Sequence, residues 1–339
     1  MARSAHPRLK FLAPGWFAVV LGWGGLALAW HQATALLGEP AAMISQVLGW
    51  AAIGALGLLA LLTGLRLQLH ASDWLADVRH PVRHPVRHPV LALVPMAMLV
   101  IAGFVVQVLG ANNVWMAGFW MFGALAQLAA TVWVFHRLRQ SAATDKGPNW
   151  AGITPALFLA AAGNVVVPFA GVALGFQIWS VAQWTIGALF FVVVQVLFMV
   201  RVTAFGMLPR KLLPMLFITV APPAAGGLGL AQLGAPVEAL EGAWGIALFF
   251  VILSFLSFKP MMQEAFTIGH WALSFPLAAF AGLSMHLALM TQNGAMQTFA
   301  ILALALASVI IGWLTLATAR GLRDGSLLAP EPVALIHAA

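Results

Sequence analysis

The chain has 339 residues, of which 62% are hydrophobic and only 7% are charged. A soluble domain is typically about 45–50% apolar and about 25% charged, so this composition excludes an ordinary water-soluble protein. The formal net charge is +7, but the 16 Lys and Arg residues lie in short segments beside long apolar runs. That arrangement is typical of membrane topology rather than of a nucleic-acid surface. Cysteine is absent, which excludes disulfides and thiol chemistry.

Apolar runs of membrane-spanning length follow one another along the chain. Because every backbone polar group must be paired within hydrocarbon, runs without strict alternation predict membrane-spanning α-helices. The first run is longer than the apolar part of a signal peptide and is expected to be a retained span. Residues 1–339 are therefore predicted to form a single transmembrane domain of the all-α class. The ten predicted spans are 12–36, 42–67, 89–110, 113–135, 151–175, 178–200, 212–233, 242–258, 265–289 and 296–318.

The charges of the connecting segments predict the orientation. If the N-terminus is cytoplasmic, all 16 basic residues fall on the cytoplasmic side. The connections on the opposite side then carry Glu39, Glu238 and Glu241. Since cytoplasmic loops are enriched in Lys and Arg, both termini are predicted to be cytoplasmic.

Prolines inside the predicted spans occur only in the odd-numbered spans. Proline lacks a backbone donor and bends a helix. Odd spans also present small residues at helical spacing, whereas even spans carry bulky aromatic residues, as expected of helices that face lipid. The pattern predicts five helical hairpins, with five kinked inner helices around a central axis. Prolines that merely adjust packing are the alternative. These prolines are Pro14, Pro95, Pro155, Pro168, Pro214, Pro222, Pro223 and Pro276.

A four-residue unit is repeated three times before the third span, in the sequence RHPVRHPVRHPV of residues 79–90. Its histidines, His80, His84 and His88, have the spacing of metal ligands on one helix face. The prolines disfavour that helix, because each removes a donor and favours an extended residue before it. We interpret the repeat as a duplication in a cytoplasmic loop, with a metal site as the less favoured alternative.

No ionisable residue lies in the middle of a predicted span. His31, His136, His270 and His286 all lie near span ends, so the sequence offers neither a proton relay nor paired haem ligands. A phosphate-binding GxxxxGKS/T motif and a constellation of acid, base and nucleophile are also missing. The sequence therefore predicts a protein that is not an enzyme and needs no cofactor or metal.

A lumen without carboxylates, open toward a basic cytoplasmic face, would not repel anions and would attract them to one mouth. Asn164, Thr219 and Ser274 could donate hydrogen bonds to a passing anion. A bond from each to a neighbouring helix is the alternative. These features favour small anions as the transported ions.

Several motifs along the chain resemble one family of membrane proteins. They are HWALSFPLAAFAGLSM (270–285), PGWFAVVLGWGGLALAW (14–30), GNVVVPFAGVALG (163–175), LPMLFITVAPPAAGGLG (213–229) and one RHPV unit before the third span. Together they resemble the tellurite-resistance/dicarboxylate transporter family of TehA-like proteins, which includes the plant slow-type anion channels. The resemblance implies ten helices in a quasi-fivefold arrangement around a central pore, and a homotrimer with one pore per protomer.

The expected function is a gated or passive anion channel, or uniporter, in the inner membrane of a bacterium. The alternative is a secondary carrier, proton-coupled or not, of C4-dicarboxylates or of oxyanions such as tellurite and sulfite. The expected partners are small anions, the lipid bilayer and further copies of the chain, and no nucleic acid.

The resemblance also implies a pore gate at Phe275, because a phenylalanine before the proline of the ninth span blocks the pore in that family. At helical spacing the same face continues through Ala279 and Gly282. A phenylalanine packed in an ordinary core is the alternative. The remaining residues expected to line the pore or kink its helices are Gly22, Pro95, Asn164, Pro168, Thr219, Pro222, Gly226, Pro276 and Ala279.

The predicted orientation can be tested with single cysteines, since the chain contains none. Cysteines at Asn113, Gln177 or Asn293 should react with an impermeant thiol reagent from outside the cell. Cysteines at Arg83, Thr144 or Ser326 should react only after the membrane is opened. Labelling of intact cells at Ser326 would disprove an even number of spans.

Overall fold

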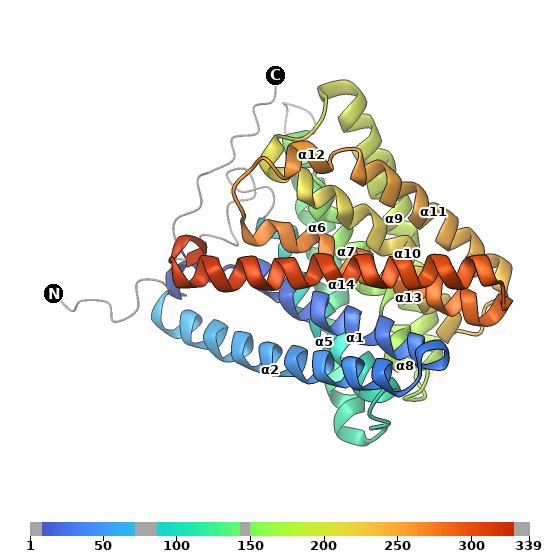
Figure 1. Cartoon of the computed structure of the whole chain (residues 1–339). Coiled ribbons are helices and arrows are strands. Elements are labelled where there is room, and N and C mark those ends of the chain that lie inside the picture. Colours follow the sequence, from blue (N-terminus) through green and yellow to red (C-terminus); the bar gives the residue numbers. More distant parts are fainter. Residues whose placement is uncertain (1–8, 72–86, 143–149, 329–339) are drawn as a thin grey trace.

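The structure, a computed structural model, describes residues 9–71, 87–142 and 150–328 (Figure 1). The described part of the chain consists of helices and their connections, without a β-strand. This confirms the predicted all-α class. Residues 79–86 of the RHPV repeat lie outside the described residues. The last unit forms a single helical turn, α4 (Arg87–Val90), so the expected extended conformation is wrong there.

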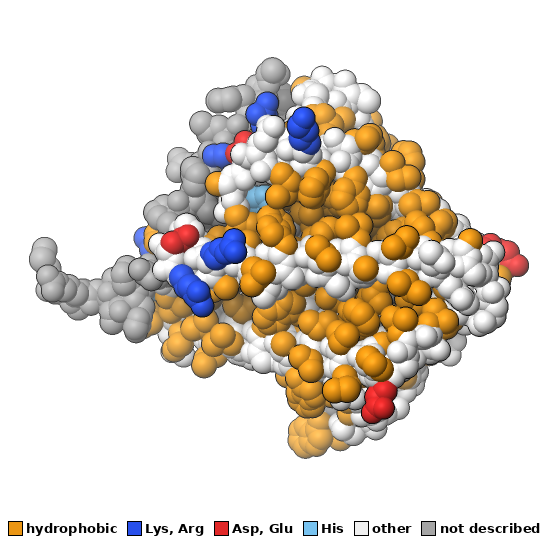
Figure 2. Space-filling model, in the orientation of Figure 1, with side chains coloured by type: hydrophobic (Ala, Val, Ile, Leu, Met, Phe, Trp, Pro, Cys, Tyr) orange, Lys and Arg blue, Asp and Glu red, His pale blue; other side chains and the backbone are white. Residues whose placement is uncertain are grey.

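Five long helices form the outside of the molecule. Their faces carry many exposed apolar side chains, such as Trp115 and Ile178, which are 85% and 88% exposed. On the face shown in Figure 2, apolar side chains cover the middle, while Lys and Arg gather at one end. An apolar surface of this extent fits contact with lipid rather than water. The five are α2 (Glu39–Leu69), α6 (Val114–Ala142), α9 (Gln177–Phe205), α11 (Val237–Phe255) and α14 (Gly294–Arg323).

Five inner segments lie among these helices, and nearly all their residues are buried. Contacts join α1 to α5, α5 to α7 and α8, α7 to α10, α10 to α13, and α13 back to α1, which makes a closed ring. Each inner segment also packs against the long helix that follows it in the chain. The segments are α1 (Phe17–Leu37), α5 (Leu93–Gln107), α7 (Phe158–Val165) with α8 (Pro168–Gly171), α10 (Ala221–Gln232) and α13 (Ser274–Thr291).

Among the described residues, 7 helical stretches are long and apolar enough to cross a membrane. They are the five outer helices and the stretches Arg210–Gln232 and Ile268–Thr291. Two shorter apolar stretches, Leu93–Gln107 and Pro155–Gly171, lie in the ring as well. The predicted number of ten spans and the fivefold symmetry remain predictions.

Prolines of the inner segments lie where helices begin. Pro222 and Pro276 occupy the first turns of α10 and α13, where a missing N–H breaks no helical hydrogen bond. Pro168 begins α8, and the Asn164 carbonyl accepts from the N–H of Val167 instead, at 3.3 Å. The expected kinks are therefore junctions between helical segments. Four of these junctions follow 3-10 segments: η2 (Pro14–Trp16), η4 (Pro155–Leu157), η5 (Arg210–Val220) and η6 (Ile268–Leu273).

Short elements complete the fold. They are η1 (Leu9–Phe11), η3 (Trp150–Gly152), α12 (Phe258–Met261) and η7 (Ser326–Leu328).

Indole N–H groups tie the inner ring to the outer helices. Since an unpaired N–H is costly in apolar surroundings, each bond fixes which helices pair and at what depth. Two of these bonds run from α1 to α14, and each of the outer helices α6, α9 and α11 contributes one tryptophan donor. The bonds join Trp23 to Thr315, Trp30 to Ser308, Trp271 to Thr318, Trp120 to the Val167 carbonyl, Trp184 to the Gly226 carbonyl and Trp244 to Ser284, at 2.8–3.1 Å.

Candidate functional site

A small pocket with a cavity volume of about 20 Å³ lies between the inner segments and is partly open to solvent. Its lining comes from α1, α5, α8, α10 and α13, so every member of the inner ring contributes. The lining residues are Gly25, Leu28, Ala29, Gln32, Gln107, Phe169, Leu228, Gln232, Phe275, Ala278, Ala279 and Gly282.

Two helices present matching faces to this pocket. On α1 the lining residues run from Gly25 to Gln32 and on α13 from Phe275 to Gly282, in each case at positions i, i+3, i+4 and i+7. This is the spacing of residues that share one side of an α-helix. At about 1.5 Å per residue, each face extends roughly 10 Å along its helix. The small residues within these faces leave the space that the pocket occupies.

Phe275 lies at one end of the pocket. A Cβ placed on Gly25 would be only 2.9 Å from the Phe275 Cδ2 atom, so the ring packs directly against the α1 backbone. The residue is 4% exposed, yet it lines the pocket. Further along, a Cβ on Gly282 would be 3.7 Å from Ala29. The two helices thus run in register, and Gln32 lies at the far end of the α1 face.

The structure brings Ala279 into the pocket with Phe275, but the other expected site residues lie elsewhere. Gly22 packs against the start of α13, where an added Cβ would be 2.7 Å from the Ser274 Cβ atom. Thr219 donates to the Leu216 carbonyl at 2.7 Å within its own 3-10 segment. The Gly226 carbonyl accepts a hydrogen bond from the Trp184 indole N–H. Pro95, Pro168, Pro222 and Pro276 are buried in the helices of the ring and do not line the pocket.

Asn164 belongs to a buried polar cluster between α6, α7 and α9. Its Nδ2 donates to Thr131 Oγ1 at 2.7 Å and to the Ala160 carbonyl at 2.6 Å. Its Oδ1 accepts from Gln183 Nε2 at 3.0 Å. The sequence left two roles open for Asn164: donation to a passing anion or a hydrogen bond to a neighbouring helix. These contacts match the second role.

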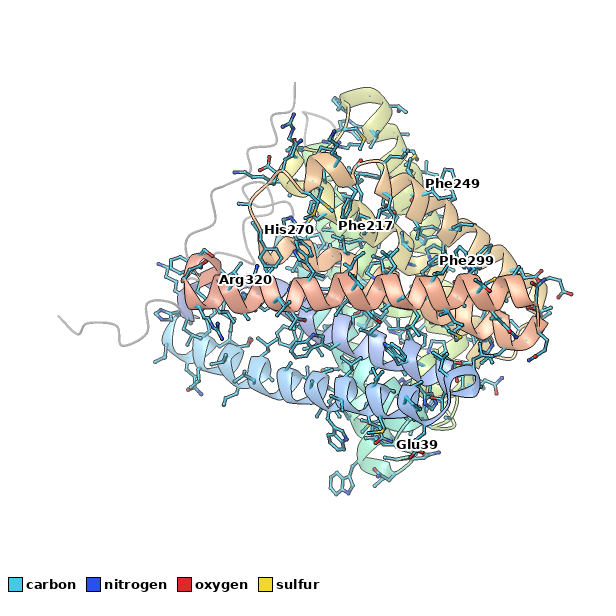
Figure 3. All side chains as sticks on the ribbon, viewed as in Figure 1. Glu39, Phe217, Phe249, His270, Phe299 and Arg320 are labelled. Carbon is cyan, nitrogen blue, oxygen red and sulfur yellow. The ribbon has the colours of Figure 1, made fainter. Side chains whose placement is uncertain are left out.

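His270 serves as a local cap in the described structure. The ring Nδ1 accepts from the Thr267 N–H at 3.1 Å, and the ring lies between Phe266 and Trp313. Figure 3 places His270 and Arg320 toward one end of the molecule and Glu39 toward the other. Among the described residues, no group of three His, Asp or Glu side chains could hold a metal ion.

The pocket lining contains no charged residue, and its polar side chains are three glutamines, Gln32, Gln107 and Gln232. Sequence reasoning did not single them out. A signal was present, because each is an amide in an apolar span close to the C-terminal end of its helix, and Gln32 continues the small face of Gly25 and Ala29 by one turn. Other glutamines lie in the apolar outer helices and weaken that signal, since position in a span alone does not separate the two groups.

Comparison with protein families gives one match over nearly the whole chain. The family model SLAC1, described as voltage-dependent anion channel, matches residues 12–319. Among proteins of curated function, none matches the chain. The matched range includes all five inner segments and therefore every residue that lines the pocket.

The accessibility of the pocket can be tested by two matched substitutions on α13. Ala279→Cys places a thiol in the pocket, whereas Ala281→Cys places one at a fully buried position that does not line it. We expect a small methanethiosulfonate reagent to modify the first variant at least about tenfold faster, measured by mass spectrometry of the solubilised protein. Equal rates would show that the pocket is closed to solutes.

Proposed function

We propose, since the chain belongs to the SLAC1 family of voltage-dependent anion channels, that it conducts small anions passively along the axis of its inner ring. Family membership makes the protein a membrane channel or transporter of small anions. The conduction path and its gate are the parts that the proposal adds.

One observation carries the proposal: the five inner segments of a single chain line one pocket, with an uncharged lining and Phe275 at one end. Without carboxylates in the lining, an anion meets no fixed negative charge there. A pocket lined by one chain also supports one pore per protomer in the expected homotrimer.

Phe275 is proposed to be the gate. An apolar ring across a narrow lumen blocks ions because it offers nothing to replace their water. The ring is held from one side by Gly25, while Ala278 and Ala279 leave space beside it in the pocket. Pro276 follows directly in the first turn of α13, where its ring fixes the backbone next to Phe275 without breaking a helical hydrogen bond.

The proposed orientation places both termini in the cytoplasm of a bacterium whose inner membrane holds the protein. Support comes from the outer helices α2, α6, α9 and α14, because each carries its basic residues near its C-terminal end. Glu39 and Glu238 lie instead in the first turns of α2 and α11. Under the positive-inside rule this distribution puts Phe275 toward the cytoplasm and the three glutamines toward the outside.

Passive conduction is favoured over coupled transport by the chemistry of the lining. Proton-coupled carriers relay protons through ionisable groups, and no residue that lines this pocket is titratable. In proteoliposomes, a reversal potential that follows the anion gradient and ignores an imposed pH gradient indicates a channel. Flux that stops without a pH gradient indicates a carrier.

The gate is tested by Phe275→Ala, with Phe280→Ala on the same helix as the control. Phe280 faces α11 and α14, stacked on Trp244 and edge-on to Phe299. Its truncation should cost about 3–5 kcal/mol of stability, as in a packed core, and leave conductance unchanged. Phe275→Ala should cost clearly less, because one side of the ring borders open space, and should raise chloride conductance in lipid bilayers several-fold.

A Phe275→Ala variant that folds normally and conducts no better than the parent would refute the gate. Severe loss of stability in this variant would instead identify Phe275 as an ordinary core residue.

A further inference from the structure

Three glutamines form a rim at the end of the pocket opposite Phe275; we call Gln32, Gln107 and Gln232 the glutamine rim. Gln107 and Gln232 are the last residues of α5 and α10, and Gln32 lies one turn before the end of α1. All three are half-buried and line the same pocket. The rim therefore draws one amide from each of three different members of the inner ring.

The rim supplies the only side-chain hydrogen-bond donors in the pocket lining. The other lining residues are Gly, Ala, Leu and Phe. Each amide carries two N–H donors. Gln107 uses one of them to bond the Phe169 carbonyl at 2.6 Å, which fixes its amide against α8. No hydrogen bond within the described residues engages the amides of Gln32 or Gln232, so both can turn their N–H groups into the pocket.

The setting favours an anion over a cation. Cation sites in proteins are built from several oxygens, usually with a carboxylate, and no carboxylate lines this pocket. The carbonyl ends of α5 and α10 on the same side carry partial negative charge, which opposes an anion. Amide donors offset that charge without adding a full positive one, so binding is weak enough for the ion to leave again.

We propose that the glutamine rim coordinates a small monovalent anion of halide size, with Gln32 and Gln232 as donors and Gln107 as a fixed third. This inference rests on the proposed anion conduction. It names the residues that replace part of the hydration shell of the anion once the ion has passed Phe275. Bromide is the probe, because it has the size and charge required and scatters X-rays anomalously.

The first experiment measures binding without requiring conduction. Crystals of the unmodified protein grown in sodium bromide should show an anomalous peak within hydrogen-bond distance of the Gln32 and Gln232 amides. The peak should be lost in the double variant Gln32→Leu/Gln232→Leu and kept in Gln46→Leu, which makes the same change on the exposed face of α2. Absence of a peak in the unmodified protein overturns the site. A peak that persists in the double variant marks an adventitious ion only. If crystals soaked in a rubidium salt show a peak at this place and the bromide crystals show none, the rim is a cation site.

The second experiment measures the effect of the rim on transport. In the Phe275→Ala background, adding Gln32→Leu/Gln232→Leu should lower bromide conductance several-fold, whereas adding Gln46→Leu should leave it unchanged. Equal conductance in all three proteins overturns the role of the rim while anion conduction stands. If the Phe275→Ala background does not conduct at all, the proposed function fails, and the bromide peak still decides whether the rim binds an anion.

Discussion

The close approach of α1 and α13 is the constraint on which the rest of the structure depends. Gly22 and Gly25 touch Ser274 and Phe275 so closely that an added Cβ would lie within 3 Å of either residue. Small residues allow helices to approach in this way where lipid gives no hydrophobic drive for association. The same approach places Phe275 against a backbone rather than a side chain. Beyond Gly25 the small residues of α1 and α13 are less tightly packed against each other, and the pocket lies there.

Hydrogen bonds to an outer helix hold this arrangement in place at several positions along the helix axis. Trp23 and Trp30 of α1 donate hydrogen bonds to α14, and Trp271 of η6, just before α13, donates a third. These three bonds link both sides of the α1–α13 contact to one long helix. Because each indole would otherwise remain unpaired in apolar surroundings, sliding of α14 along the pair is costly. These bonds hold the frame around Phe275 in place, so under the proposed function opening requires movement of the phenylalanine side chain.

Much of the fold could be predicted from the sequence because lipid imposes simple rules. Long apolar runs predicted the helices, and small residues at helical spacing predicted that the odd-numbered spans, among them α1, are the inner helices. The 3-10 segments before α10 and α13 could not be predicted, since periodicity does not separate tight helical turns from α-helix. Asn164 has the same signal whether it faces a lumen or another helix, and only the partners Thr131 and Gln183 decide between them. The glutamine rim was missed because it is assembled from three distant segments.

The central claim is that anions pass through the pocket beside Phe275. The most direct measurement combines the gate substitution with a thiol in the path, as Phe275→Ala/Ala279→Cys in a chain that has no other cysteine. Chloride current through this protein in a planar bilayer should fall by most of its value when a charged methanethiosulfonate reagent is added, and return on reduction. Phe275→Ala alone should not respond. Current that is undiminished after complete modification of Cys at position 279 would contradict the account, because the anions would then take another route.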